Sequence, residues 1–336
     1  MKSTPHNLVM SYIYGGRDGQ RPAVINPTSI ACQELMKASE AWFPEAHLKA
    51  ETMARLALAG HELLGFDSVM PEYSVHQESA AFGVDMDWGT PGMMPDSKTF
   101  PYQDFGRVVV PDNILEKPSL AVVLRALEIL RREVGGRAAI IGKVMGPWTL
   151  SYHMVGTQRF LTAVGRKKFD LVKKMVESLA PVTIAFAKAQ FRAGADVVVM
   201  ADHATGNLVG PYHYRDLLLP THKELLKEIG GPVILHVCGR TMDRMELFAE
   251  SGVDVYHFES ANNAAEALEK VGGRITLTGN INNPDVLLQG APETVYQETR
   301  QVIKAGLRLV SPECAVPLTT PLANLKAIVE AAREGF

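Results

Sequence analysis

The segment Phe191-Arg-Ala-Gly-Ala-Asp-Val-Val-Val-Met-Ala-Asp202 indicates how the chain folds. A long helical pattern ends at its glycine, which can adopt the left-handed conformation that closes a helix. A short β-branched run follows at once and ends in an acidic residue. A helix that returns directly into a buried strand is typical of βα units arranged around a parallel sheet.

The same junction recurs as Ser-Gly-Val-Asp-Val at 251–255 and as Ala-Gly-Leu-Arg-Leu at 305–309. Eight β-branched runs can be counted, at 23–26, 67–70, 138–144, 196–200, 233–237, 254–258, 274–278 and 308–311. Amphipathic helical patterns lie between them, at 120–134, 169–193, 212–229 and 294–305. This alternation predicts an α/β fold, a (β/α)8 TIM barrel that forms a single domain over residues 1–336, with an N-terminal helical segment.

The segment 82–112 interrupts the alternation of strand and helix patterns, because it is rich in glycine, proline, methionine and aspartate. We expect it to form a long loop after the second strand, overhanging the mouth of the barrel. A surface insertion without a role is the alternative.

The composition limits the classes of function. The 336 residues are 46% apolar and 21% charged, with a formal net charge of -3, so no basic surface for nucleic acid is expected. No apolar run is long enough to cross a membrane, and no secretory signal is visible. Cys32, Cys238 and Cys314 are too scattered for a disulfide framework. We therefore expect a cytoplasmic protein, compatible with a homo-oligomer, whose thiols bind a metal or take part in catalysis.

A candidate metal site lies at the ends of three predicted strands. His236 and Cys238 close the run Val233-Ile-Leu-His-Val-Cys, and the two-residue period of a strand puts both side chains on one face. Cys314 follows the eighth run and Glu259 ends the sixth. Barrel enzymes place their active sites at such strand ends. Two sulfurs, one nitrogen and an exchangeable oxygen suit catalytic zinc, whereas His236 and Cys238 alone could be ordinary core residues.

Asp202 ends the fourth run and Asn280 the seventh, so both are expected to face the same mouth. Either side chain could hold the second imidazole nitrogen of His236, as partners of metal-bound histidines do. Either could instead cap a turn. His203 and His257 are further candidates with no assigned role.

The chain resembles the methylcobamide:coenzyme M methyltransferases of the uroporphyrinogen decarboxylase superfamily. The motifs that carry the resemblance include Trp42-Phe-Pro-Glu-Ala-His47, Met145-Gly-Pro-Trp-Thr149, Leu235-His-Val-Cys-Gly239, Leu277-Thr-Gly-Asn-Ile281 and Pro317-Leu-Thr-Thr-Pro-Leu-Ala-Asn324. The resemblance implies that His236, Cys238 and Cys314 bind zinc, with Glu259 as a fourth, displaceable ligand. The last cysteine is commonly flanked by glycines in that family, whereas Glu313 precedes it here.

The resemblance also implies methyl transfer between a corrinoid such as methylcobalamin, carried on a separate corrinoid protein, and a zinc-activated acceptor. A thiol such as coenzyme M, tetrahydrofolate, or a methylated compound demethylated in reverse are the small-molecule partners to consider. The loop 82–112 and the rim residues near Trp148 and Tyr152 could line the docking face for the corrinoid protein, although an aromatic residue near a barrel rim is more often a packing residue.

Two other functions remain open. A metal-free uroporphyrinogen decarboxylase would need an arginine-rich segment and an aspartate to grip its tetrapyrrole, and 25–30 and 71–74 offer no counterpart. A non-catalytic paralogue that binds the corrinoid protein would keep the fold and the zinc.

Overall fold

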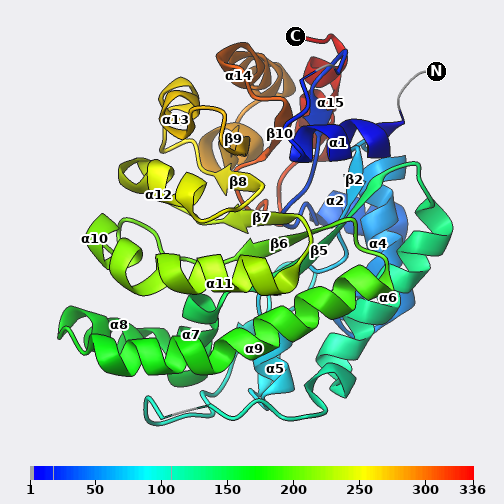
Figure 1. The fold of residues 1–336 in the computed structure, drawn as a ribbon. Helices are drawn as coiled ribbons and strands as arrows, with labels where there is room; N and C mark the ends of the chain where they lie inside the picture. Colours follow the sequence, from blue (N-terminus) through cyan, green and yellow to red (C-terminus); the bar gives the residue numbers. More distant parts are fainter. Residues whose placement is uncertain (1–3, 18, 107) are drawn as a thin grey trace.

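In the computed structural model, which describes residues 4–17, 19–106 and 108–336, eight parallel strands form one sheet that curls into a barrel (Figure 1). Their order around the sheet is β1-β10-β9-β8-β7-β6-β5-β2. The strands are β1 Ala23–Val24, β2 Ser68–Val69, β5 Ala139–Met145, β6 Val197–Ala201, β7 Val233–His236, β8 Val255–Phe258, β9 Thr276–Ile281 and β10 Leu309–Pro312. Each predicted run overlaps one of them, so the predicted (β/α)8 barrel is confirmed.

The ring closes between its two shortest strands, β1 and β2. Asp67 N–H donates to the Val24 carbonyl oxygen at 2.7 Å, and Val24 N–H donates to Asp67 Oδ2 at 2.8 Å. The Arg21 guanidinium donates hydrogen bonds to both oxygens of the same carboxylate, at 2.7 and 2.8 Å. A side chain therefore completes the hydrogen bonding that two-residue strands cannot supply alone.

An aspartate of this kind stands before three of the strands, each time two residues after a glycine. We call these aspartates, Asp67, Asp196 and Asp254, the strand clamps. Each accepts a hydrogen bond from a backbone N–H of the preceding barrel strand. The pairs are Val24 with Asp67, Ile140 with Asp196, and Val233 with Asp254, each at 2.8 Å. The Gly-x-Asp junctions thus both end a helix and join neighbouring strands.

Helices surround the barrel and follow its strands (Figure 1). They are α1 Pro5–Ile13, α2 Gln33–Ser39, α3 Glu45–Leu48, α4 Ala50–Glu62, α5 Gln77–Ala81, α6 Pro118–Val134, α7 Pro147–Val155, α8 Thr157–Gly165, α9 Phe169–Ala193, α10 Pro211–His213, α11 Leu219–Ile229, α12 Met245–Glu250, α13 Ala264–Val271, α14 Pro292–Ala305 and α15 Leu322–Arg333. Among the described residues, no helix combines the length and apolar character needed to cross a membrane.

One predicted helix, over 212–229, differs in detail. A π-helical turn, η2 Tyr214–Leu218, separates α10 from α11. Pro220 follows it directly and has no N–H to donate to the preceding turn, which accounts for the local change of hydrogen bonding.

The N-terminal helix α1 covers the amino-terminal end of the barrel. Its Leu8, Val9 and Ile13 pack against inward side chains of the strands, including Ile141 and Ile234. This confirms the predicted N-terminal helical segment. Because α1 closes the amino-terminal end, the carboxyl-terminal rim is the end left for a functional site.

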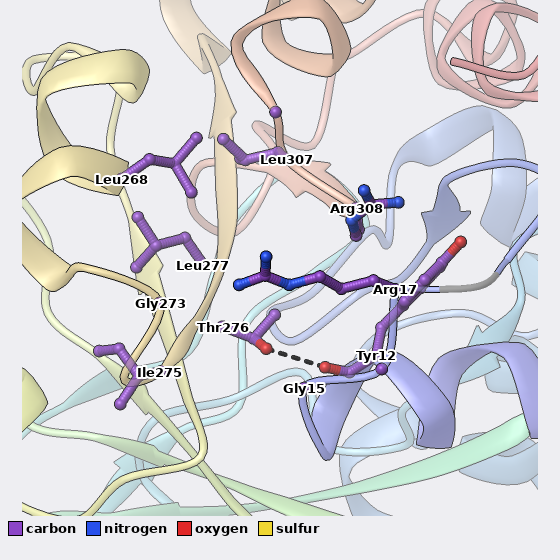
Figure 2. A pocket seen from close by; sticks show the side chains of 12 residues that line it. Tyr12, Gly15, Arg17, Leu268, Gly273, Ile275, Thr276, Leu277, Leu307 and Arg308 are labelled. Atoms are coloured by element: carbon purple, nitrogen blue, oxygen red, sulfur yellow. Dashed lines mark hydrogen bonds between the residues drawn. The ribbon is translucent and has the colours of Figure 1, made fainter.

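A pocket of about 210 Å³ lies beside α1, and Figure 2 shows the Arg17 side chain extending into it. Arg308 also lines it. The carboxyl-terminal ends of α13 and α14 meet here, at Gly273 and Gly306. Guanidinium groups complement the negative ends of helices, so the cationic lining has a structural explanation.

The segment 82–112 is more ordered than predicted, and residue 107 within it lies outside the described residues. It contains an antiparallel hairpin of β3 Met86–Asp87 and β4 Asp96–Ser97. Tyr102 N–H donates to the Met154 carbonyl oxygen at 3.2 Å, and Phe105 stacks on Phe160. The segment therefore packs along α7 and α8, the helices that follow β5.

Candidate metal centre

His236, Cys238 and Cys314 meet at the carboxyl-terminal rim of the barrel. Cys238 Sγ lies 3.0 Å from His236 Nε2 and 3.4 Å from Cys314 Sγ, and Cys314 Sγ lies 3.6 Å from His236 Nε2. We call these three atoms the ligand triangle. Around a tetrahedral zinc ion the corresponding edges would be about 3.6 to 3.8 Å, given typical Zn–S and Zn–N bond lengths. The observed edges lie within about 0.6 Å of that geometry, so the triangle fits one metal ion after a small expansion.

The protonation of the two thiols also favours a cation. Hydrogen bonding from Cys238 lowers the pKa of Cys314, whereas the same hydrogen bond and burial raise the pKa of Cys238 well above its usual range. The two thiols therefore do not ionise together readily without a positive charge nearby. Burial holds the pKa of His236 well below its usual range, so its ring is neutral at pH 7 and can coordinate a metal.

Glu259 stands next to this triangle, directly after β8. One of its carboxylate oxygens lies within 4.8 Å of both sulfurs. Burial raises the pKa of Glu259, and a hydrogen bond from the Gly239 backbone opposes that rise. Since the residue is only partly buried, its carboxylate can reach a metal and can also move away from it.

Asp202 is fully buried, and its backbone N–H donates to the His236 carbonyl oxygen at 3.0 Å, but its side chain does not bond the His236 ring. Its Oδ1 accepts the Thr149 N–H at 2.7 Å, and its Oδ2 lies 2.8 Å from His222 Nε2. The carboxylate thus caps the first turn of α7. Gly146 makes room for it, since a Cβ there would come within 2.2 Å of Asp202 Cγ.

Asn280 lies at the rim, with a backbone φ of 70°. Its Nδ2 donates to the carbonyl oxygens of Glu259, at 3.1 Å, and Asn262, at 2.8 Å. Asn280 therefore positions the backbone that carries Glu259. The expectation that Asp202 or Asn280 holds His236 is wrong, since both side chains are already engaged. Among the described residues, His236 Nδ1 has no hydrogen-bond partner.

Glu313, the residue that departs from the family pattern, turns away from the triangle. Its Oε2 accepts the Ser260 N–H and its Oε1 accepts the Asn283 N–H, both at 2.8 Å. The carboxylate links the loop after β8 to the turn after β9. Glu313 is therefore a structural cross-link between the two loops.

Of the two aromatic residues considered for docking, Trp148 is fully buried and packs edge-on against Phe160. It does not line an exposed surface, and it is the packing residue that the alternative described. Tyr152 is partly buried, and its hydroxyl lies 2.8 Å from His203 Nδ1.

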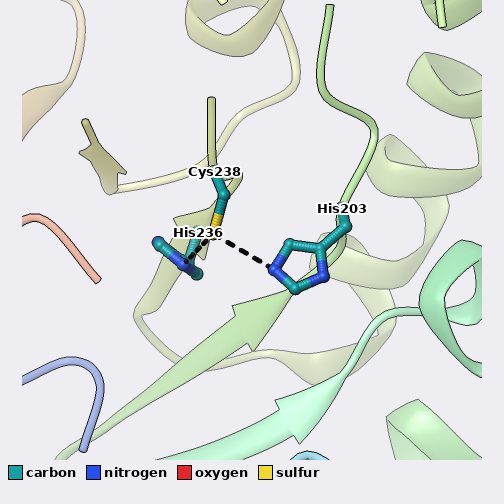
Figure 3. A group of neighbouring side chains, drawn as sticks. All are labelled: His203, His236 and Cys238. Carbon is teal, nitrogen blue, oxygen red and sulfur yellow. Dashed lines mark hydrogen bonds between the residues drawn. The ribbon is translucent and has the colours of Figure 1, made fainter. Parts of the chain in front are cut away.

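The sequence analysis assigned no role to His203, which touches the triangle. Its Nε2 lies 3.2 Å from Cys238 Sγ (Figure 3). His203 follows Asp202 in the loop after β6, where the alternation of a strand no longer predicts the direction of a side chain. His257 lies beside the His236 ring and is fully buried, but its Nε2 is 2.8 Å from the Pro312 carbonyl oxygen.

A buried group of charges on the loop after β2, on α5 and on β5 was also missed. Lys143 Nζ donates to the Glu72 carbonyl oxygen at 2.8 Å and lies 3.9 Å from the Glu72 carboxylate. Glu78 accepts the Met145 N–H at 2.7 Å, and burial raises its pKa to about 7. Burial lowers the pKa of Lys143. A lysine inside a strand buried on both faces was the signal that could have identified this group.

Comparison with known proteins agrees with these features. Residues 4–335 match the family model described as Uroporphyrinogen decarboxylase (URO-D). The chain is 30% identical over 332 residues to a methylated-thiol--coenzyme M methyltransferase of Methanosarcina mazei, covering 98% of this chain and 89% of the relative. It is 31% identical over 324 residues to the methylcobamide:CoM methyltransferase MtaA of Methanosarcina barkeri, covering 96% of this chain and 95% of the relative.

Similarity extends to a solved structure, a methyltransferase from Methanosarcina mazei. The two structures align with a TM-score of 0.93 at 29% identity, covering 98% of each chain. Sequence and structure therefore agree over almost the whole length. The chain belongs to the uroporphyrinogen decarboxylase superfamily and, within it, to the methylcobamide:coenzyme M methyltransferase family.

Proposed function

We propose that the chain is a zinc-dependent corrinoid methyltransferase that moves a methyl group between a methylated corrinoid and a thiol acceptor. The ligand triangle carries this proposal, because an imidazole nitrogen and two sulfurs lie within 3.6 Å of one another at the rim. Structural zinc sites have four protein ligands, whereas catalytic ones keep a position that can be exchanged. Glu259, partly buried beside the triangle, suits that position.

Bound zinc would supply positive charge that lowers the pKa of an incoming thiol. Each group of residues in the site then has its own task. Cys238 and Cys314 provide negative charge to the centre, and His236 provides a neutral nitrogen. Glu259 makes room for the acceptor, while Asn280 and Asn262 keep its backbone in place. Position and electrostatics are the contribution expected of the protein, since the cobalt–carbon bond carries the difficult chemistry.

The names of the relatives support the choice of substrates. Both relatives described above are named for methyl transfer to coenzyme M, and one of them also for methylcobamide. We therefore propose coenzyme M or a similar small thiol as the acceptor, and a corrinoid protein as the partner that presents the methyl group. The partner would dock at the carboxyl-terminal rim, where the triangle lies.

The first experiment measures zinc in the purified protein, comparing the wild type with Cys314→Ala by elemental analysis. We expect one zinc per wild-type chain and its loss in the variant. Cys32→Ala is the matched control, because Cys32 is buried at the start of α2, outside the site. The second measurement is thiol-dependent demethylation of methylcobalamin by the zinc-loaded protein.

The outcomes separate this proposal from its alternatives. A zinc-free wild type, prepared reduced and with zinc supplied, would contradict it and favour a metal-free decarboxylase. Zinc binding together with capture of a corrinoid protein, but no methyl transfer, would favour a non-catalytic paralogue.

A further inference from the structure

A histidine outside the ligand triangle contacts one of its sulfurs. His203 Nε2 lies 3.2 Å from Cys238 Sγ, and Figure 3 shows it on the opposite side of that sulfur from His236. Among the described residues, Cys238 Sγ is the one triangle atom with which His203 makes a hydrogen bond. The histidine therefore acts on Cys238 and not on the triangle as a whole.

The position of His203 is held from two sides by α7. Thr149 Oγ1 accepts the His203 N–H at 2.9 Å, and Thr149 N–H donates to the adjacent Asp202 carboxylate. Tyr152, on the next turn of the same helix, lies 2.8 Å from His203 Nδ1 through its hydroxyl. A ring held at its backbone and at its far nitrogen cannot easily rotate away from Cys238.

The contact between Tyr152 and Nδ1 bears on which ring nitrogen carries the proton. With the Tyr152 hydroxyl as donor to Nδ1, the single N–H of a neutral imidazole lies on Nε2, which faces the sulfur. A protonated ring would also have an N–H at Nε2, so the donor role does not depend on titration of His203.

We propose that His203, oriented by Tyr152, donates a hydrogen bond to the Cys238 thiolate and protects it from methylation. This inference rests on the proposed methyltransferase function. In such an enzyme the thiolates that hold the metal face the same methyl donor as the substrate thiol. A hydrogen bond to a thiolate withdraws charge from the sulfur and makes it a weaker nucleophile. Cys238 can then keep its place in the centre while the substrate reacts.

The reaction that His203 suppresses can be followed with a simple methyl donor. With methyl iodide, the Cys238 sulfur would attack the methyl carbon, an S–C bond would form, and iodide would leave with the electron pair of the broken C–I bond. Peptide mass spectrometry detects the product as a gain of one CH₂ group on Cys238. Cys314 in the same protein serves as the internal reference.

Two substitutions separate a hydrogen-bond donor from a mere space-filling residue. His203→Leu removes the donor, whereas His203→Gln keeps an N–H near the position of Nε2. In zinc-loaded protein we expect Cys238 of His203→Leu to be methylated about tenfold faster than in the wild type. We expect His203→Gln to remain close to the wild type, and Tyr152→Phe to lie between them. His213→Leu, which removes an imidazole on α10 next to Phe169, is the control.

Zinc content is measured in every variant before the reaction. Equal methylation of Cys238 in the wild type, Tyr152→Phe and zinc-loaded His203→Leu would overturn the inference and leave the proposed function intact. Loss of zinc from folded His203→Leu and His203→Gln alike would make His203 a metal ligand, which also overturns it. A wild type that binds no zinc would instead contradict the proposed function. Should His203→Leu fail to fold, Tyr152→Phe against the wild type gives the same comparison.

Discussion

His222 Nε2 lies 2.8 Å from Asp202 Oδ2, and both side chains are fully buried behind the candidate metal centre. The Tyr214 hydroxyl lies 2.9 Å from the other nitrogen of His222. Asp202 also caps α7, the helix that carries Thr149 and Tyr152. The pair therefore connects the outer helices to the loop that presents His203.

Asp202→Ala should destabilise the protein, because it leaves the Thr149 N–H and a His222 ring nitrogen buried without partners. We expect the free energy of unfolding to fall by about 2 to 5 kcal/mol, measured by denaturant titration. The double variant Asp202→Ala/His222→Ala should lose less unfolding free energy than the two single variants added together. Each single change already breaks the Asp202–His222 interaction, so the double variant loses it once and the sum counts it twice. Strict additivity would show that the pair is not coupled.

Glu259 and Glu313 should differ in their effect on metal binding. Glu259→Gln is expected to weaken zinc retention, measured by competition with a chelator, because a neutral amide is a poorer ligand than a carboxylate. Glu313→Gln should keep the zinc affinity, since its carboxylate binds the Ser260 and Asn283 N–H groups. It should instead lower the free energy of unfolding by about 1 to 3 kcal/mol, because the amide has one acceptor oxygen for two donors. Equal zinc loss in both variants would place Glu313 at the metal.

The strand clamps should differ in strength. Asp67 binds Val24 N–H and the Arg21 guanidinium, whereas Asp254 accepts a single backbone N–H from Val233. We expect Asp67→Ala to cost about 3 to 5 kcal/mol of unfolding free energy, and Asp254→Ala about 1 to 3 kcal/mol. Denaturant titrations of both variants test this order. A smaller loss at Asp67 would mean that the closure between β1 and β2 does not depend on its carboxylate.

Glu78 should make stability depend on pH near neutrality. Burial raises its pKa from 4.5 to about 7 in the folded protein. Between these values the folded state binds more protons than the unfolded state, so the free energy of unfolding falls as pH rises. The loss amounts to at most about 3 kcal/mol.

Glu78→Gln should therefore remove the part of the pH dependence between about pH 5 and 7 in which stability falls as pH rises, and so make the slope more positive than in the wild type. The glutamine keeps an oxygen for the Met145 N–H, so the change removes the titration and little else. Glu72, whose pKa burial also raises, acts in the same direction and leaves part of the slope. Glu62→Gln, at the exposed end of α4, is the control. An unchanged slope in Glu78→Gln would show that this carboxyl does not titrate in the window.

Much of the fold could be predicted because its signals are local. A β-branched run after a glycine, as at 194–200, predicts a strand without knowledge of its neighbours. The hairpin of β3 and β4 could not be predicted in this way, because its strands have only two residues each and carry no alternating pattern. The π turn before Pro220 likewise reflects a tertiary compromise within an otherwise helical pattern.

The candidate site also contains residues that could be predicted from the sequence and residues that could not. The parity of β7 was sufficient to place His236 and Cys238 together, and strand ends brought Cys314 and Glu259 to the same rim. The partners of Asp202 could not be predicted, since His222 lies 20 residues away in an outer helix. His203 was missed because it lies in a loop, whose conformation is set by Thr149 rather than by its own sequence.

The strand clamps also bear on the order in which the barrel assembles. Each joins two strands that follow one another in the chain, across 43, 56 and 21 residues for Asp67, Asp196 and Asp254. Such strand pairs can form early in folding, as small cooperative units, before distant parts of the chain come into contact. The pair of β9 and β10 has Arg308 where the aspartate would stand, and β10 must also find β1 at the other end of the chain. Because it joins the two ends of the chain, the pairing of β1 with β10 is expected to form last as the barrel assembles.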